Sequence, residues 1–384
     1  MPREKEPVGL QDVPRRIATN RLGQWLYLFD NAGVLFSESL SRFAGLSPAG
    51  AVAYQAFDAG ASLDELLQSR GVSPGSGETA EELEQLYALS QGIFPDFAER
   101  DPWPALQTEQ TANLKIDDIP VLVEFPQGPL EELCRDYFRN FALTSKPAKH
   151  HLSAQQDEHD WTIFANGNPF LTSLDDSQLG LGFMHAARSL LYAEAAYDVA
   201  FHAGMVANNH AGVMLCAPRE AGKSTLAAYL LSHGFDLLAD EPTLLDLDTR
   251  TVASLNQPVS LKEGSWAVLS EHQAQLQQSP VHMRSDGIRI RLLHPPTTSH
   301  RSTSQLTHIV FPEYRPSSPT EIEKLRPIQA LTLLNESGMI LAKDLPLQKF
   351  ETLLSMLCTT PACTLKYASL PGAFAFMSEF VRMK

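Results

Sequence analysis

The stretch from residue 211 to residue 246 constrains the fold more than any other part of this sequence. Residues 213–216 form a short apolar run typical of a buried strand, and Gly222 interrupts the pattern soon afterwards. The composition then becomes helical, and Gly234 occupies the position of a left-handed helix C-terminal cap. A second apolar run, residues 235–239, follows that glycine. The segment therefore predicts a strand, a loop, a helix and a second strand, in that order.

The loop of this segment predicts a binding site for the phosphates of ATP. Lys223 and Ser224 stand where the helix begins, so unpaired backbone N–H groups and the positive end of the helix dipole face the loop. Lys223 adds a full positive charge, and the hydroxyl of Ser224 can ligate Mg²⁺. The pattern GxxxxGK[ST] is met by Gly222, Lys223 and Ser224, but Ala217 stands in place of its first glycine. The residues predicted to bind ATP are Ala217, Arg219, Glu220, Ala221, Gly222, Lys223, Ser224, Thr225 and Lys262.

Glu220 departs from the usual chemistry of such a loop. It brings a carboxylate close to the expected phosphates, where like charges repel. We expect Arg219 or the metal ion to act as its partner.

Two adjacent carboxylates, Asp240 and Glu241, follow the second strand. One reading is a solvated strand end before Pro242. The other is a metal-binding and base pair, because ligands of α/β sheets bind at the carboxyl ends of the strands. Phosphoryl transfer needs a cation on the phosphates and a group that orients or deprotonates the acceptor hydroxyl. We favour this second interpretation, with Ser224, Asp240 and Glu241 as ligands of Mg²⁺.

Composition limits the classes of partner and compartment. The 384 residues favour two domains, and the formal net charge of −15 argues against a nucleic acid or an anionic membrane as partner. The four cysteines show no CxxC pair or metal-ligand spacing, which favours reduced thiols. The N-terminus carries no apolar signal segment, and no run is long enough to span a membrane. We therefore expect a cytoplasmic protein; a homo-oligomer is compatible with the sequence.

The N-terminal part of the chain has its own pattern. Residues 1–20 are polar and expected to be mobile. Residues 25–36 predict a β-hairpin, and helices are predicted after Ser47, after Ser62 and over residues 80–90. A hairpin with helices suggests a small winged-helix-like α+β domain over residues 21–92.

This arrangement resembles the PqqD-like peptide-binding domains, whose lineage pattern matches the segment from Phe57 to Leu66. The resemblance implies that residues 21–92 bind the leader of a ribosomally made precursor or carrier peptide, commonly as an added edge strand. A domain that only braces the rest of the chain is the alternative. Residues 93–112, rich in proline, are predicted to be a linker.

The remaining chain, residues 113–384, resembles the HPr kinase/phosphorylase group, and more closely the HprK-related kinases encoded near peptide-modification genes. The stretches that carry the resemblance are residues 201–203, 221–226, 237–241, 258–263 and 308–312.

The resemblance implies a mixed-sheet α/β core related to phosphoenolpyruvate carboxykinases, which uses ATP and Mg²⁺ to phosphorylate a serine or threonine hydroxyl. Lys223 would hold the β- and γ-phosphates, and Asp240 and Glu241 would share the metal and base roles. His202 would support these carboxylates or contact the phosphate, and Lys262 would reach phosphate or substrate. A non-catalytic nucleotide-binding or peptide-delivery protein with a degenerate loop remains the alternative. The acceptor, the oligomeric state and any phosphorylase activity are left open by the sequence.

Overall fold

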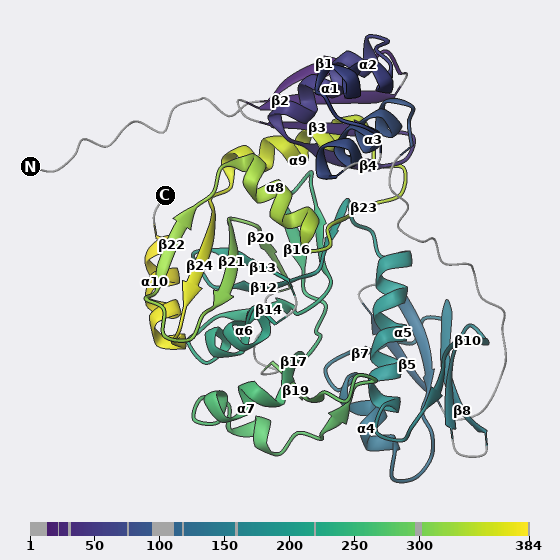
Figure 1. Ribbon diagram of the computed structural model, residues 1–384. Coiled ribbons are helices and arrows are strands. Elements are labelled where there is room, and N and C mark those ends of the chain that lie inside the picture. The colour runs from purple at the N-terminus through teal and green to yellow at the C-terminus, as the bar shows by residue number, and fades with distance from the viewer. Residues whose placement is uncertain are drawn as a thin grey trace, which may run out of the picture. The chain divides into compact units, whose positions relative to one another are not determined.

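The computed structural model describes residues 14–21, 23–29, 32–74, 77–93, 111–116, 119–157, 160–218, 220–295 and 302–382. These residues form two compact units (Figure 1). The first unit contains the described residues up to 93 together with residues 325–332 and 341–359, and the second unit contains the rest. No helix in the described ranges has the length and apolar character that a membrane crossing requires.

A four-stranded antiparallel sheet, in the order β1-β2-β3-β4, organises the first unit. Leu26 and Leu35 of this sheet share a buried apolar core with Tyr54 and Phe57 of the first helix. The predicted hairpin and its three following helices are confirmed, including the capping box of Ser62 with Glu65. The elements are β1 (Arg15–Ala18), β2 (Gln24–Phe29), β3 (Ala32–Ser37), β4 (Arg42–Leu46), α1 (Pro48–Asp58), α2 (Leu63–Ser69) and α3 (Glu78–Ser90).

The other face of this sheet packs on helix α9 (Leu347–Thr359), which comes from far along the chain (Figure 1). Side chains alternate between the two faces of a strand, so Tyr27 and Phe36 point away from the core made by Leu26 and Leu35. Phe350 of α9 covers them. Its ring stacks on Phe36 with centroids 4.0 Å apart, and it is fully buried. The sequence predicts this helix but assigns it to the second domain, because periodicity does not show which sheet a helix covers.

The position of the hairpin within the sheet corrects one expectation. Strands β2 and β3 are interior strands, since β1 pairs with β2 and β4 pairs with β3. Among the residues that the structure describes, the edge strands of this sheet are therefore β1 and β4, and neither strand of the 25–36 hairpin is an edge. Residues 15–18, expected to be mobile, are strand β1, whereas the earlier residues and most of the predicted linker lie outside the described residues.

A six-stranded mixed sheet, in the order β14-β12-β13-β21-β24-β22, forms the centre of the second unit. Strands β13, β21 and β24 are parallel, and β14 runs in their direction because both it and β13 are antiparallel to β12. The carboxyl ends of these strands therefore lie at one edge of the sheet. The elements are β12 (Ala203–Ala207), β13 (Gly212–Cys216), β14 (Asp236–Ala239), β21 (His308–Tyr314), β22 (Glu321–Lys324) and β24 (Ala362–Tyr367).

Helices α6 (Lys223–Leu231) and α10 (Leu370–Phe380) share one buried core with this sheet. A second sheet contains β20 (Thr303–Gln305), β16 (Thr251–Ala253), β15 (Thr243–Asp246) and β11 (Val199–Phe201), in this order. A three-stranded sheet has the order β17-β19-β18. Its strands are β17 (Val259–Lys262), β18 (His282–Met283) and β19 (Arg289–Leu293), and α7 (Glu263–Leu269) and the 3₁₀ helix η1 (Ala274–Gln277) lie between them in the sequence.

A further six-stranded sheet, in the order β10-β9-β8-β6-β5-β7, packs on helix α5 (Leu179–Glu194). The polar sequence of residues 143–160 predicts a loop, but this prediction is wrong, because strand β8 occupies part of the range. The run is polar because β8 is exposed along its second half. Its elements are β5 (Thr111–Ile116), β6 (Ile119–Glu124), α4 (Glu131–Asp136), β7 (Ala142–Leu143), β8 (His150–Asp157), β9 (Asp160–Ala165) and β10 (Asn168–Leu174). Helix α8 (Pro327–Glu336) and strand β23 (Ile340–Leu341) lie where the chain passes between the units.

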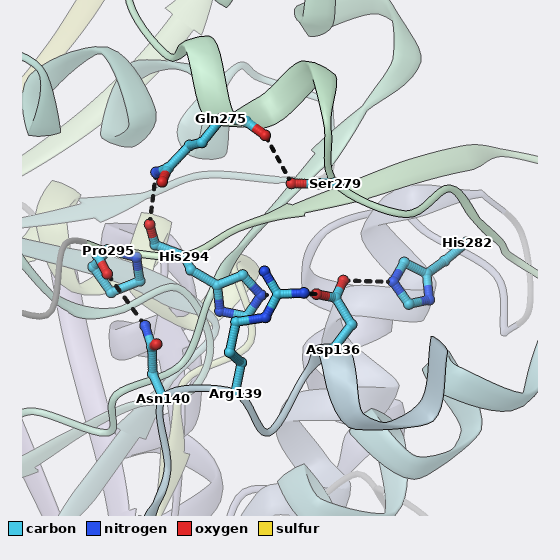
Figure 2. A network of polar contacts seen from close by, with 8 residues as sticks. All are labelled: Asp136, Arg139, Asn140, Gln275, Ser279, His282, His294 and Pro295. Carbon is cyan, nitrogen blue, oxygen red and sulfur yellow. Dashed lines mark hydrogen bonds and ion pairs between the residues drawn. The ribbon is translucent and has the colours of Figure 1, made fainter. Parts of the chain in front are cut away.

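A buried carboxylate links α4 to the three-stranded sheet (Figure 2). Asp136 accepts hydrogen bonds from Nε2 of His282, at 2.9 Å, and from Nε2 of His294, at 3.1 Å. A carboxylate can only accept, so both imidazoles carry their proton on Nε2. Burial alone would raise the pKa of Asp136, but the two histidine hydrogen bonds outweigh it and lower the pKa to about 2. Arg139, at 2.9 Å from the same carboxylate, completes the network.

Candidate functional site

Gly222 shapes the loop between β13 and α6. The apolar strand ends at Cys216, and α6 begins at Lys223. Gly222 lies between them with a positive φ of 92°, and a Cβ there would approach the hydroxyl of Tyr367 to 2.4 Å. Only glycine fits this position. The close approach brings the amino end of α6, with its free N–H groups, to the edge of the sheet where the strands end.

Lys223 closes the loop onto its own beginning. Its ammonium group donates a hydrogen bond to the carbonyl oxygen of Ala217 at 2.7 Å. Ala217 is buried under the loop, and the Ala221 carbonyl accepts a hydrogen bond from the backbone of Tyr314. The first glycine of the usual pattern can therefore be replaced by alanine here, because this residue contributes its carbonyl and is held against the core.

Glu220 finds its partner far along the sequence. Its carboxylate pairs with the ammonium group of Lys262 at 2.8 Å, and this contact lowers the pKa of Glu220. Arg219, the partner expected from the sequence, lies outside the described residues. Glu220 has a φ of 71°, which is a conformation that glycine adopts more readily. Two residues predicted separately from the sequence are thus in direct contact.

Ser224 and Asp240 meet at the carboxyl ends of the central strands. The hydroxyl of Ser224 donates a hydrogen bond to Oδ1 of Asp240 at 3.1 Å. The other oxygen, Oδ2, accepts a hydrogen bond from the backbone of Ser260 at 2.9 Å. Asp240 is only 6% exposed, and burial raises its pKa to about 6 even though Arg188 opposes the shift.

His202 and Glu241 face each other at the crossing of two sheets. His202 occupies the bend between β11 and β12, and Glu241 the bend between β14 and β15. Since β11 pairs with β15 and β12 pairs with β14, the two bends are held opposite one another. Nδ1 of His202 lies 2.7 Å from Oε1 of Glu241. Burial would raise the pKa of Glu241, but the hydrogen bond with His202 and the positive charge of Arg188 lower it to about 2.

One cavity of about 1060 Å³ in the second unit brings most of the predicted residues together. The apolar run around His202 predicts that this residue lies on a strand, but His202 occupies a bend instead, from which it reaches this cavity. Predicted residues that line the cavity are His202, Glu220, Gly222, Lys223, Ser224, Thr225, Asp240, Glu241 and Lys262. Ala217 and Ala221 act through their carbonyl groups, as described above.

Sequence reasoning missed Arg188, which also lines this cavity. It lies in the middle of α5 on the same face as Leu181, Met184 and Leu191, all of which are buried. Positions three, four and seven residues apart share one face of a helix. A charged residue on an otherwise apolar helix face is the signal in the sequence that points to it.

The oxygen atoms at this site suit a hard divalent cation. Ser224, Asp240 and Glu241 supply a hydroxyl and two carboxylates from neighbouring positions, and Mg²⁺ prefers oxygen ligands. Within the described ranges no group of three or more His, Cys, Asp or Glu side chains has the geometry of a metal site. Mg²⁺ at ATP sites is usually held by one or two carboxylates, substrate phosphates and water, so this donor set fits it.

No family model matches the chain. No curated protein matches it either. Among solved structures, the chain is similar to the HPr(Ser) kinase/phosphatase from Coxiella burnetii, with 10% sequence identity and a TM-score of 0.24. The match covers 48% of this chain and 97% of that one. At this level of similarity the neighbour assigns no role to any residue here.

Proposed function

We propose that the chain is an ATP- and Mg²⁺-dependent kinase that phosphorylates a serine or threonine hydroxyl on a peptide or small protein. Its second unit would be an HPr-kinase-type core with the phosphate loop at residues 217–225. The observation that carries this proposal is the hydrogen bond between Ser224 and Asp240. It joins the hydroxyl at the start of a helix to a carboxylate at a strand end, beside Lys223 and inside one cavity.

The residues divide the work of phosphoryl transfer in a consistent way. N–H groups at the start of α6 and the ammonium of Lys223 would hold the terminal phosphates. Ser224, Asp240 and Glu241 would hold Mg²⁺, which supplies charge neutralisation on the phosphates. The bond from the γ-phosphorus to the β–γ bridging oxygen breaks, a bond to the acceptor oxygen forms, and a carboxylate takes the acceptor proton. Asp240, whose burial raises its pKa to about 6, would be the stronger base of the two carboxylates.

Support for the acceptor class comes from the first unit. We propose that it is a PqqD-like domain that binds the leader of a precursor peptide in a ribosomal-peptide modification system. The free edges of β1 and β4 offer backbone groups to an extended peptide. Binding there would raise the effective concentration of the acceptor at the kinase site.

Incubation of the whole protein with MgATP and the precursor peptide encoded beside its gene, followed by intact mass, tests the kinase proposal. A gain of one phosphate on the peptide is the expected result. Nucleotide binding without any transfer would instead favour a non-catalytic peptide-delivery protein. The same peptide without its leader should react with a KM at least about tenfold higher and an unchanged kcat. Equal KM values with and without the leader would mean that the first unit does not bind the leader and only supports the rest of the chain.

A further inference from the structure

Arg188 presents an unused pair of hydrogen-bond donors in the candidate site. Its side chain is 9% exposed, and its Nε and Nη2 atoms are buried with no hydrogen-bond partner among the described residues. These two nitrogens form the side-on fork of a guanidinium, the edge that binds two oxygens of one carboxylate or phosphate. The Tyr137 hydroxyl, which is near enough to Arg188 to help raise the pKa of the guanidinium, also lacks a partner of good hydrogen-bond geometry among the described residues.

The other cations that line the cavity are already engaged. Lys223 donates to the Ala217 carbonyl, Lys262 pairs with Glu220, and Arg284 pairs with Asp286 at 2.6 Å. Each of these three residues lies on a loop or at the end of a helix or strand. Arg188 differs in two respects, because its fork is unoccupied and because it projects from the middle of a helix.

Helix α5 holds Arg188 firmly in place. A Cβ on Gly180 would meet the backbone oxygen of Leu133 at 2.7 Å, and one on Gly182 would meet Leu174 at 2.8 Å. Both glycines therefore allow α5 to lie in close contact with α4 and β10. A rigid support of this kind is what a binding residue needs, since a loose one loses affinity to its own disorder.

Burial disfavours the charged guanidinium, but the nearby carboxylates of Glu241 and Asp240 outweigh it and raise the pKa of Arg188, so the fork stays charged. Glu241 and Asp240 are its electrostatic neighbours, so it stands on the side of the cavity where the reacting groups are proposed to lie. We infer that the Arg188 fork is an oxyanion subsite that binds two oxygens of the terminal phosphoryl group of the nucleotide. The inference rests on the proposed function, because it assigns this group to ATP; the same chemistry would also hold free phosphate.

Calorimetry on the whole protein with Mg²⁺ distinguishes these sources. The probes are the non-hydrolysable β,γ-imido analogue of ATP, ADP, and inorganic phosphate. Arg188→Met should lower the affinity for the analogue about tenfold or more. It should change the affinity for ADP less than about twofold, because ADP lacks the terminal phosphoryl group. Arg188→Lys, which keeps the charge but loses the fork, should fall in between. Lys223→Ala should weaken the binding of both nucleotides. Arg135→Met, which changes an exposed arginine, is the matched control and should leave both affinities unchanged.

Two further results would contradict the Arg188 subsite. Equal weakening of analogue and ADP by Arg188→Met, or no change in either, would overturn the subsite. Near-UV circular dichroism checks that Arg188→Met is folded. If it is not folded, the affinities of Arg188→Lys for the analogue and for ADP are compared instead, and equal weakening of both again contradicts the subsite. If the wild type binds neither nucleotide, the proposed function fails. The subsite then survives only if inorganic phosphate raises the melting temperature of the wild type but not of Arg188→Lys.

Discussion

Nζ of Lys262 lies 2.8 Å from Oε1 of Glu220, so an ion pair joins the loop at residues 217–222 to the end of β17. In this pair the ammonium group of Lys262 is bound to Glu220, and the negative charge of Glu220 lies beside the expected phosphates. A substrate that enters this cavity must therefore compete with Glu220 for Lys262.

Replacing Glu220 with glycine should strengthen ATP binding. Glycine adopts the observed φ of 71° without strain, and the change frees Lys262 to contact phosphate. We expect affinity to rise by about two- to fivefold, since exposed pairs contribute modestly. Calorimetry measures the ATP affinity. Glu220→Gln removes the negative charge but keeps a side chain, so it separates the effect of the charge from the effect of the glycine backbone. Unchanged or weaker binding in both variants would mean that Glu220 has a role of its own.

Lys223→Ala should weaken MgATP about tenfold or more. The variant loses a charge-assisted contact at the start of α6, worth about 1.5 to 3 kcal/mol. Lys324→Ala, an exposed lysine on β22, is the control and should bind as the wild type does. Equal ATP affinity for wild type and Lys223→Ala would remove the phosphate site from residues 217–225.

Asp240→Asn should separate binding from chemistry. The amide keeps the size of the side chain, so we expect the fold and much of the nucleotide affinity to persist. It cannot accept the acceptor proton and holds Mg²⁺ less strongly, so phosphate transfer should fall by at least about a hundredfold. Single-turnover assays with intact mass measure this loss. Undiminished transfer would assign the base role elsewhere, with Glu241 next in line.

Asp136 should make stability depend on acidic pH. Its folded pKa, lowered to about 2, is below the unfolded value of about 3.9. The ionised carboxylate therefore stabilises the fold above about pH 4, and this contribution is lost as pH falls toward 2. Asp136→Asn should lower the free energy of unfolding at neutral pH by about 1.5 to 3 kcal/mol. Urea titrations between pH 2 and 7 test this, and parallel pH curves for the two proteins would contradict it.

Phe350→Ala should destabilise the first unit by about 3 to 5 kcal/mol, the usual loss for a buried phenylalanine. The ring is fully buried against Phe36, so its removal leaves a cavity under the sheet. Phe376→Ala, whose ring is 37% exposed on α10, is the control and should change stability little. Denaturation followed at Trp25, a residue of β2, reports on the first unit. A wild-type midpoint for Phe350→Ala would show that α9 is not needed there.

Local signals account for the elements that the sequence predicts. Ser47, Ser62 and Gly234 mark helix ends, and the structure has caps there. The strand, loop, helix and second strand from residue 212 to residue 239 are also foreseeable, because they follow each other directly, while the phosphate-binding role of the loop stays a prediction. The α/β class with mixed sheets is confirmed, while the HPr-kinase core and the leader-binding domain stay predictions.

Long-range pairing accounts for the rest. Lys262 and Glu220 are far apart in sequence, and no local pattern shows that they meet. The same holds for Arg188. The sequence predicts a helix over residues 179–197, but the direction of the Arg188 side chain depends on how α5 packs. Phe350 is a third case, since an amphipathic helix fits any apolar face of the right width.

The return of α9 to the first unit has a consequence for how the protein is made. A ribosome that has delivered residues 14–93 has delivered a sheet with one face uncovered, because residues 347–359 are not yet synthesised. Tyr27 and Phe36 remain open to water or to chaperones until residues 347–359 have emerged. Synthesis from the N-terminus therefore does not finish the first unit before most of the second has been made. The first unit is completed by residues 347–359, and the second by β24 and α10, which follow them in the sequence.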